Sequence, residues 1–187
     1  MDTVELLINE ELELDGVFAI SLVEEPAIES NFVALNKHEV ALKVIDEDKR
    51  IVLGIALKPN KKIPRRKGDY VYNVEFSNET VRKASELYLS NLHSNNTTVD
   101  HKDLVENVSL SETWIVEDVK KDKTALYGID AAVGDWAIAM KVNNDDVWAD
   151  VKKGTYLGFS IEGMFDESIV DKNEQKFNQI KEILKDV

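Results

Sequence analysis

The sequence predicts an α+β fold in which a small, mostly antiparallel β-barrel or sheet is surrounded by a few helices. Short apolar runs bounded by turn residues indicate about eight strands. Only three segments have the apolar spacing of three and four residues that is typical of a helix. These segments do not follow the regular strand–helix–strand order of a parallel sheet. We therefore expect antiparallel pairing to dominate.

Length and composition limit the function classes. The 187 residues suit one domain, which we assign to residues 1–170, with an amphipathic helix at residues 171–187. The chain has no cysteine, which excludes disulfides, zinc–thiolate sites and a cysteine nucleophile. Its 36 acidic and 23 basic residues give a formal charge of -13, which opposes binding to duplex nucleic acid. Met1–Glu5 does not resemble a signal peptide, and the longest apolar run is too short to span a bilayer.

The first half of the chain is dominated by strand patterns. Weak alternation at residues 3–8 predicts an edge strand, and the continuous apolar runs at residues 17–23 and 50–57 predict buried strands. Residues 58–67 combine six lysines and arginines with Pro59 and Pro64, so we expect an exposed basic loop. A docking patch for an acidic partner is the alternative there. Residues 70–76 are expected to form the strand that follows.

The second half mixes helices and strands. Ser77 or Asn78 is expected to cap a helix whose apolar positions continue to Leu92. A short helix is expected at residues 144–150, ending at Gly154. The expected strands of this half are residues 108–116, 124–129, 135–142 and 154–163.

The last of these strands contains a candidate nucleophile. Side chains alternate along a strand, so Ser160 shares a face with Gly158 and Glu162. Because glycine has no side chain, we expect the hydroxyl to have open space beside it, as a nucleophile approached by a peptide carbonyl needs. Most strand serines only form hydrogen bonds, and this remains the alternative for Ser160.

A serine nucleophile needs a base, which is almost always histidine. The chain has three, His38, His93 and His101. His101 differs from the others because it follows the apolar Val99 at the mouth of a strand, between acidic residues. A surface turn histidine is the alternative. The acidic neighbours form only a weak metal-binding pattern, since adjacent loop residues rarely close a site by themselves.

A third group has to orient the imidazole and stabilise its charged form. Glu112 is our first candidate, because it lies in the strand that follows His101. Asp100 and Glu162 are the alternatives. Glu162 is about 6.5 Å from Ser160 along the strand, a separation that favours a bystander.

Several stretches, taken together, resemble one protein family. They are Val99–His101, Ser111–Asp118, Trp136–Val142 and Gly158–Gly163, together with Phe18–Ile28. Their sequences and their spacing resemble the prohead, or capsid maturation, serine proteases of tailed phages. The fold of that family is related to the herpesvirus assembly protease. The resemblance extends from about residue 15 to about residue 165 and implies a small β-barrel with helices around it.

The resemblance also implies a function. It indicates a serine endopeptidase, with residues 1–170 as the protease domain, that acts inside the phage procapsid in the host cytoplasm. Such enzymes cleave the scaffold protein or the scaffolding segment of the major capsid protein, and often themselves. The family order of histidine before serine assigns His101 as general base and Ser160 as nucleophile. We expect no metal or organic cofactor, no membrane and no specific nucleic acid, and a homo-oligomer is compatible with this function.

One departure from the family concerns the third residue. In the usual phage order, a segment like Ser21–Val23 follows the nucleophile, whereas here it precedes it, as if the barrel were circularly permuted. Ala19 stands where an acid or a histidine is expected. Either Glu112 or Asp100 then substitutes, or a Ser–His dyad operates. By the same analogy, backbone N–H groups of Glu24–Ile28 line the oxyanion hole.

Two other functions remain open. The first is a catalytically inactive capsid- or scaffold-associated protein with the same fold. It is suggested by Ala19, which stands where an acid or a histidine is expected. A carbohydrate- or peptide-binding β domain would need an aromatic groove, to which Trp114, Trp136 and Trp148 are the candidates. We expect these three residues to pack in the core instead.

Overall fold

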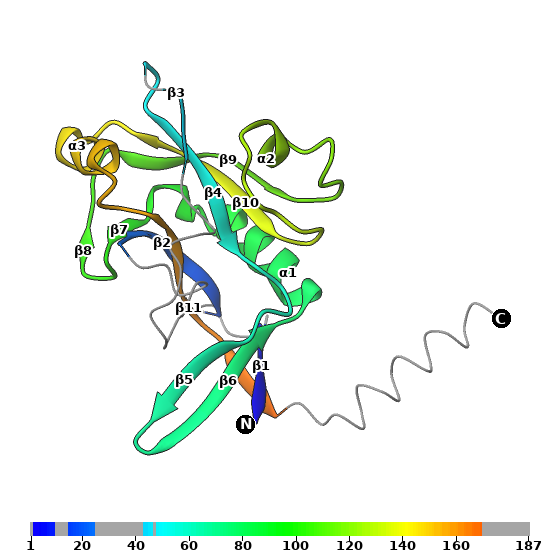
Figure 1. Cartoon of the computed structure of the whole chain (residues 1–187). Coiled ribbons are helices and arrows are strands. Elements are labelled where there is room, and N and C mark those ends of the chain that lie inside the picture. Colours follow the sequence, from blue (N-terminus) through cyan, green and yellow to red (C-terminus); the bar gives the residue numbers. More distant parts are fainter. Residues whose placement is uncertain (1, 10–14, 25–42, 47, 170–187) are drawn as a thin grey trace.

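The computed structural model describes residues 2–9, 15–24, 43–46 and 48–169 (Figure 1). Its strands are β1 Thr3–Leu7, β2 Gly16–Val23, β3 Lys43–Asp46, β4 Ile51–Leu57, β5 Ile63–Lys67, β6 Tyr70–Phe76, β7 Thr97–Val99, β8 Asp103–Leu104, β9 Val108–Ile115, β10 Trp136–Val142, β11 Gly158–Met164 and β12 Asp166–Ile169. Its helices are α1 Asn78–Ser90, α2 Lys123–Leu126 and α3 Asp145–Lys153, with a 3-10 turn, η2, at His93–Asn95.

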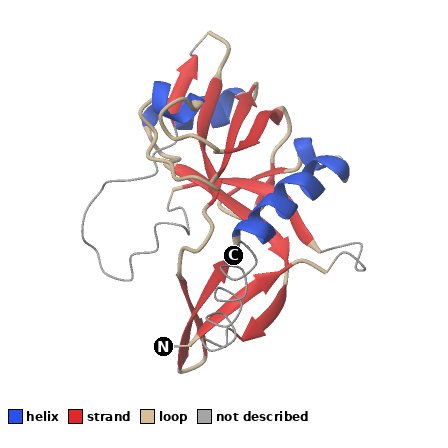
Figure 2. Cartoon of the chain, turned by 90° about the vertical axis from the view of Figure 1, so that its right-hand side faces the viewer, coloured by secondary structure: helices blue, strands red, loops and turns tan. Residues whose placement is uncertain are grey.

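The described strands form three four-stranded sheets. Their orders are β12-β1-β6-β5, β3-β4-β10-β9 and β11-β2-β7-β8. Figure 2 shows the strands in the middle of the molecule and the helices at its periphery. The expected α+β class is confirmed. In the described part of the chain, however, the strands make three separate sheets and do not close into one barrel.

The sheet β11-β2-β7-β8 brings together segments that are far apart in the sequence. Strand β2 is one of its two inner strands, with Ile20 and Leu22 fully buried. It pairs antiparallel with β11, so that Ser21 lies opposite Ser160, and parallel with β7, so that Ser21 lies beside Thr98. Directly paired residues share a face of the sheet, and Ser160, Ser21 and Thr98 therefore lie on the same face.

The sheet β3-β4-β10-β9 forms much of the core. Strands β4 and β10 are apolar along both faces and are buried on both, as a continuous apolar run indicates. Trp136 at the start of β10 is fully buried, and its indole N–H donates a hydrogen bond to the Thr113 hydroxyl at 2.6 Å. Trp148 on α3 is also buried, whereas Trp114 is half-buried and donates to the Asp122 carboxylate. The expected core packing is therefore confirmed for Trp136 and Trp148.

Helix α1 begins where the sequence indicates. The Ser77 hydroxyl accepts a hydrogen bond from the Thr80 N–H at 3.2 Å, which satisfies one of the free amide groups of the first turn. Val81, Ala84 and Tyr88 recur at three and four residues and are fully buried. The helix therefore covers the core with one apolar face.

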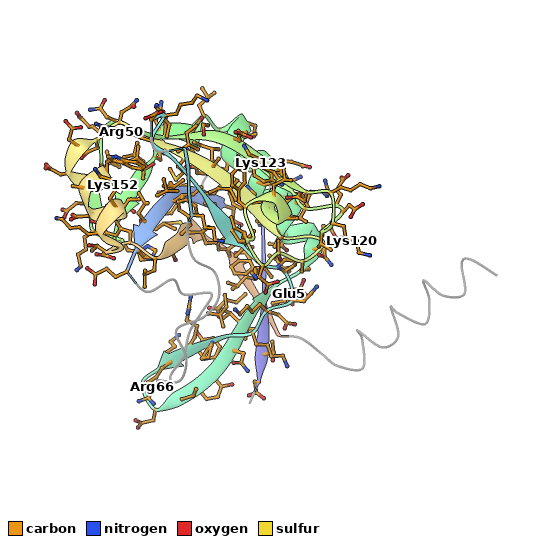
Figure 3. All side chains as sticks on the ribbon, turned by 45° about the horizontal axis from the view of Figure 1, so that its top comes forward. Glu5, Arg50, Arg66, Lys120, Lys123 and Lys152 are labelled. Carbon is orange, nitrogen blue, oxygen red and sulfur yellow. The ribbon has the colours of Figure 1, made fainter. Side chains whose placement is uncertain are left out.

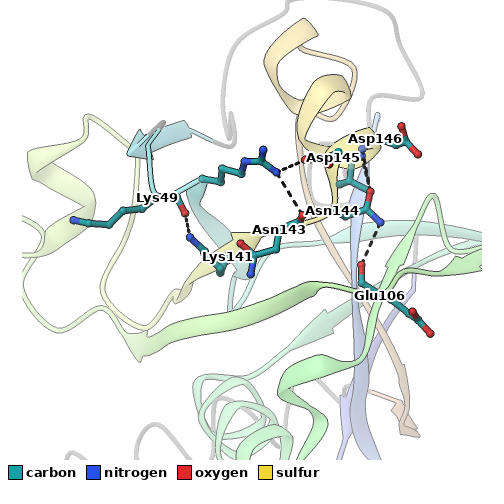
Figure 4. Close-up of polar contacts among 9 residues, drawn as sticks. Lys49, Glu106, Lys141, Asn143, Asn144, Asp145 and Asp146 are labelled. Carbon is teal, nitrogen blue, oxygen red and sulfur yellow. Dashed lines mark hydrogen bonds and ion pairs between the residues drawn. The ribbon is translucent and has the colours of Figure 1, made fainter.

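Helix α3 is fixed at its start by a group of polar contacts (Figure 4). The Asn144 side-chain oxygen accepts hydrogen bonds from the N–H groups of the first turn, and its amide donates to the Glu106 carbonyl at 3.2 Å. Arg50, just before β4, forms a 2.6 Å ion pair with Asp145. Gly154 ends the helix in the left-handed conformation that favours glycine.

The structure differs from the sequence predictions in two places, the basic segment and the N-terminal strand. Residues 63–67 are not a loop: they form β5, which pairs with β6 in a hairpin that extends from the body (Figure 1), with Arg66 at its far end (Figure 3). Pro64 is tolerated because β5 is the last strand of its sheet. Strand β1 forms as expected but lies between β12 and β6, so it is not an edge strand.

The strand predicted at residues 124–129 is also wrong. Helix α2 begins there, because the Asp122 carboxylate accepts hydrogen bonds from both the N–H and the hydroxyl of Thr124, each at 2.8 Å. This local cap outweighs the apolar pattern. Strand β10 consequently pairs with β4 and β9.

Gly163 lies where β11 passes very close to the start of β2. A Cβ atom at this position would be 2.5 Å from the Gly16 carbonyl oxygen and 2.7 Å from the Phe165 ring. We expect Gly163→Ala to lower the free energy of unfolding by about 1–3 kcal/mol, because the backbone of β2 has to shift. Urea unfolding measures this change, and an unchanged midpoint would contradict the close approach.

Several expectations concern residues outside the described ranges. These are the terminal helix at residues 171–187, most of the segment that leads into β3, His38, and the oxyanion-hole residues after Glu24. Among the described residues, no helix has the length and apolar character needed to cross a membrane.

Candidate active site

His101 lies in the turn of the β7–β8 hairpin. The Lys102 N–H donates to the Val99 carbonyl at 3.0 Å, and both residues between them, Asp100 and His101, have positive φ, at 46° and 56°. Positive φ at both central positions is typical of a type I′ turn. Aspartate and histidine are among the few side chains enriched in this conformation. The Asp100-His101 pair therefore favours this turn and puts the imidazole at its tip.

Strand β2 holds this turn in place. The Asp100 N–H donates to the Leu22 carbonyl at 3.0 Å, and the His101 N–H donates to the Ser21 hydroxyl at 3.1 Å. The Asp100 carboxylate accepts the Glu24 N–H at 3.1 Å. Unfavourable backbone conformations persist only where the surroundings stabilise them, and they cluster at functional sites. The neighbouring strand thus fixes the position of the imidazole.

The imidazole contacts a carboxylate on β11. His101 Nδ1 lies 3.2 Å from Glu162 Oε1, and the Thr98 hydroxyl donates a hydrogen bond to the same oxygen. The side chains of His101 and Glu162 are 42% and 22% exposed, so the pair lies at the surface but is partly shielded. A carboxylate acceptor favours a proton on Nδ1 and leaves Nε2 free to accept one. This is the tautomer that a general base needs.

Ser160 lies two residues before Glu162 on the same face of β11. It is paired with Ser21, whose hydroxyl accepts the His101 N–H and contacts the Leu22 carbonyl. Within the described residues, no hydrogen bond joins the Ser160 hydroxyl to the His101 ring. Catalytic hydrogen bonds are often long or poorly aligned before substrate binds and tighten in the substrate complex.

Ser160 is less accessible than the sequence indicates. Gly158 was expected to leave the hydroxyl open, but Ser160 is only 4% exposed and Gly158 is buried as well. Ser160 nevertheless forms part of the wall of a cavity next to β11. Most of the other lining residues, including Ile161 of β11, belong to the apolar core face of the sheet, whereas the Ser160 side chain lies on the face of Ser21 and Glu162.

The structure does not bring Glu112 to the histidine. Glu112 lies on β9, in another sheet, and its carboxylate accepts two hydrogen bonds from Lys123, at 2.5 and 2.7 Å. Glu162 contacts His101 instead. Its separation from Ser160 along the strand favoured a residue without a catalytic contact. In the structure, however, Glu162 contacts the imidazole across the sheet. Only the register of β11, β2 and β7 reveals this contact.

The other candidates have structural contacts. His93 lies in η2 beyond α1, with its Nδ1 at 3.0 Å from the Asn96 amide and its ring against Tyr88. The Asp100 carboxylate binds the Glu24 N–H, so this amide of the expected oxyanion-hole segment is already paired. In the described ranges, no group of three or more acidic, histidine or cysteine side chains is arranged to hold a metal ion.

A buried carboxyl elsewhere has a structural contact. Burial raises the pKa of Asp135, which is almost fully buried at the turn before β10. Its carboxylate accepts the Ala132 N–H at 2.9 Å and lies 3.7 Å from Lys58 Nζ. Perturbed pKa values often mark functional sites. These contacts, however, stabilise the turn that precedes β10 in the sheet β3-β4-β10-β9.

The fold and the site define an α+β protein with a serine, a histidine and a carboxylate on one face of a sheet, the side-chain set of a serine hydrolase. Residues 39–169, more than half of the chain, match the family described as "Putative phage serine protease XkdF". The chain belongs to this family of phage serine proteases. The match includes His101, Ser160 and Glu162, whereas β2 lies before it. No curated protein and no solved structure gave a significant match.

Proposed function

We propose that this chain is a serine endopeptidase in which Ser160 is the nucleophile, His101 the general base and Glu162 the residue that orients the imidazole. The observation that carries this proposal is the 3.2 Å contact between His101 Nδ1 and Glu162, on the strand face that also carries Ser160. Family membership supports the reaction class.

In the proposed reaction, His101 Nε2 takes the proton of the Ser160 hydroxyl while its oxygen bonds to the peptide carbonyl carbon. The Glu162 carboxylate stabilises the imidazolium through Nδ1–H. His101 then gives the proton to the leaving amine, the C–N bond breaks and an acyl-enzyme remains. A water molecule, deprotonated in the same way, releases the acid product and restores the Ser160 hydroxyl.

Glu162 replaces Glu112 as our choice of third residue. Glu162 is paired across the sheet with Ala19, the position where the family resemblance leads us to expect an acid or a histidine. Paired side chains on one face are close neighbours, so a carboxylate on β11 can serve where β2 provides only a methyl group. The small Ala19 side chain leaves the room that Glu162 occupies.

We propose that the substrates are the phage scaffold protein and the scaffolding segment of the major capsid protein, cleaved inside the procapsid in the host cytoplasm.

We also propose a circularly permuted relation to the herpesvirus-type assembly proteases. The pairing of β2 with β11 supports this relation, because it puts the N-terminal segment beside the nucleophile strand. In the family order, that segment follows the nucleophile.

A second candidate function is a catalytically inactive component of the capsid with the same fold. The burial of Ser160 favours it, since a hydroxyl that is 4% exposed offers little surface to a substrate.

A fluorophosphonate probe, which reacts with activated serine hydroxyls, distinguishes the two functions. We expect labelling at Ser160 of the wild-type protein, with loss in Ser160→Ala. The matched control is Ser111→Ala on β9, whose hydroxyl donates to the Ala139 carbonyl and which should leave labelling unchanged. Peptide mapping by mass spectrometry measures the site. Absence of labelling in both the free protein and assembled particles would support the inactive component.

A further inference from the structure

The Glu162 carboxylate has a second partner besides the imidazole. The Thr98 hydroxyl of β7 donates a hydrogen bond to Glu162 Oε1, the same oxygen that lies 3.2 Å from His101 Nδ1. An ionised carboxylate can only accept, so the hydroxyl has to be the donor. In the described part of the chain, Thr98 and His101 are the only side chains that form a hydrogen bond or ion pair with this carboxylate.

The register of the sheet explains how Glu162 reaches this hydroxyl. Glu162 lies on β11 and Thr98 on β7, with β2 between them. Neighbouring strands are about 4.8 Å apart, so the glutamate side chain has to extend across β2. On the shared face, β2 carries Ala19, which is paired with Glu162, and Ser21, which is paired with Thr98. Both are small, and the longer side chain can pass over them.

The Thr98 side chain is well suited to fix a carboxylate. It is buried, and its branched Cβ restricts the first side-chain torsion angle. Glutamate has three rotatable bonds, and the Glu162 side chain is partly exposed. A rigid, buried donor therefore limits the positions that this flexible carboxylate can take. Ser21 fixes the backbone of the histidine in a similar way, because its hydroxyl accepts the His101 N–H at 3.1 Å.

We propose that Thr98 is a positioning residue, which holds the Glu162 carboxylate against His101 Nδ1 and so keeps the imidazole proton on that nitrogen. This inference rests on the proposed function. Thr98 does not touch the reacting atoms and acts only through Glu162. Without its hydroxyl, the carboxylate turns towards solvent for part of the time, and the proton is shared between Nδ1 and Nε2. Some of the molecules then have no free Nε2 to accept the Ser160 proton.

The first test measures the tautomer and does not depend on catalysis. Two-bond ¹H–¹⁵N NMR of the His101 ring, at a pH at which the imidazole is neutral, shows which nitrogen carries the proton. We expect Nδ1–H to predominate in the wild-type protein. Thr98→Val keeps the shape of the side chain and removes the hydroxyl. It should lower the ratio of Nδ1–H to Nε2–H by roughly 2- to 10-fold, the effect of one hydrogen bond on an equilibrium. Thr98→Ser should restore the ratio.

Thr97→Val is the matched control. Thr97 precedes Thr98 on β7 and is also buried, but it lies on the opposite face of the sheet, where its hydroxyl donates to the Val108 carbonyl at 3.3 Å. The same substitution there should leave the tautomer ratio at its wild-type value. A wild-type ratio in Thr98→Val, or equal shifts in the two valine variants, would overturn the positioning role.

The second test separates kcat from KM for peptide cleavage. Thr98→Val should lower kcat by roughly 2- to 10-fold with KM unchanged, because Thr98 has no contact with substrate in this mechanism, and Thr98→Ser should retain most of kcat. In a Glu162→Ala background, Thr98→Val should have no further effect. Thermal unfolding should show that each variant stays folded.

The two tests distinguish the positioning role from the protease function. A tautomer shift in Thr98→Val, with no cleavage of any peptide by the wild-type protein, would retain the role of Thr98 and refute the protease. Cleavage by the wild-type protein, with the same kcat in Thr98→Val as in Thr97→Val, would refute the role of Thr98 and retain the protease.

Discussion

Replacing His101 by alanine is expected to lower kcat/KM for scaffold cleavage by roughly 10⁴- to 10⁶-fold, because no other described group can take the proton of Ser160. Ser160→Ala should have an effect of the same size. The double variant should lose no more than either single variant, since the two residues act in the same step. The measurement is single-turnover cleavage of purified scaffold protein, followed by gel electrophoresis.

His93→Ala is the matched control for this experiment. His93 is also partly exposed, but it contacts Asn96 and Tyr88 at the end of α1. Its replacement should leave cleavage within a few-fold of wild type. Thermal unfolding should show that His101→Ala stays folded. Wild-type cleavage by folded His101→Ala would remove this residue from the mechanism, and additive losses in the double variant would contradict a shared step.

Glu162→Gln is expected to lower kcat by about 10²- to 10⁴-fold with little change in KM. The glutamine amide can donate a hydrogen bond to Nδ1, which moves the imidazole proton to Nε2 and prevents it from accepting the Ser160 proton. It also removes the negative charge that stabilises the imidazolium. The variant has nearly the same shape, so the loss would report on charge and tautomer.

Glu112→Gln is the matched control, because the same substitution is made in the residue that sequence reasoning favours. It removes only a partly exposed ion pair with Lys123, and such pairs contribute about 0–1 kcal/mol. We expect kcat to stay within about two-fold of wild type. A larger loss in Glu112→Gln than in Glu162→Gln would return the third role to Glu112. Equal, small losses would indicate a Ser–His dyad.

Strand and helix positions were largely predictable because their signals are local. The apolar runs of β2, β4 and β10 and the Ser77 cap of α1 need only neighbours in sequence to be recognised. The predictions at residues 63–67 and 124–129 were wrong for a related reason. An edge strand accepts proline, and a side-chain cap starts a helix against an apolar pattern, so pairing and capping decided these two segments.

The sequence by itself determined the candidates Ser160 and His101, since a hydroxyl beside glycine on a strand and a histidine between acids are local patterns. The tertiary structure alone decided which carboxylate meets the imidazole and how deeply Ser160 is buried. Both depend on β2, an N-terminal strand that pairs with β11 and β7 and sets their register. Side chains of a strand change faces with every residue, so contacts between distant strands follow from register and cannot be read from spacing along the chain.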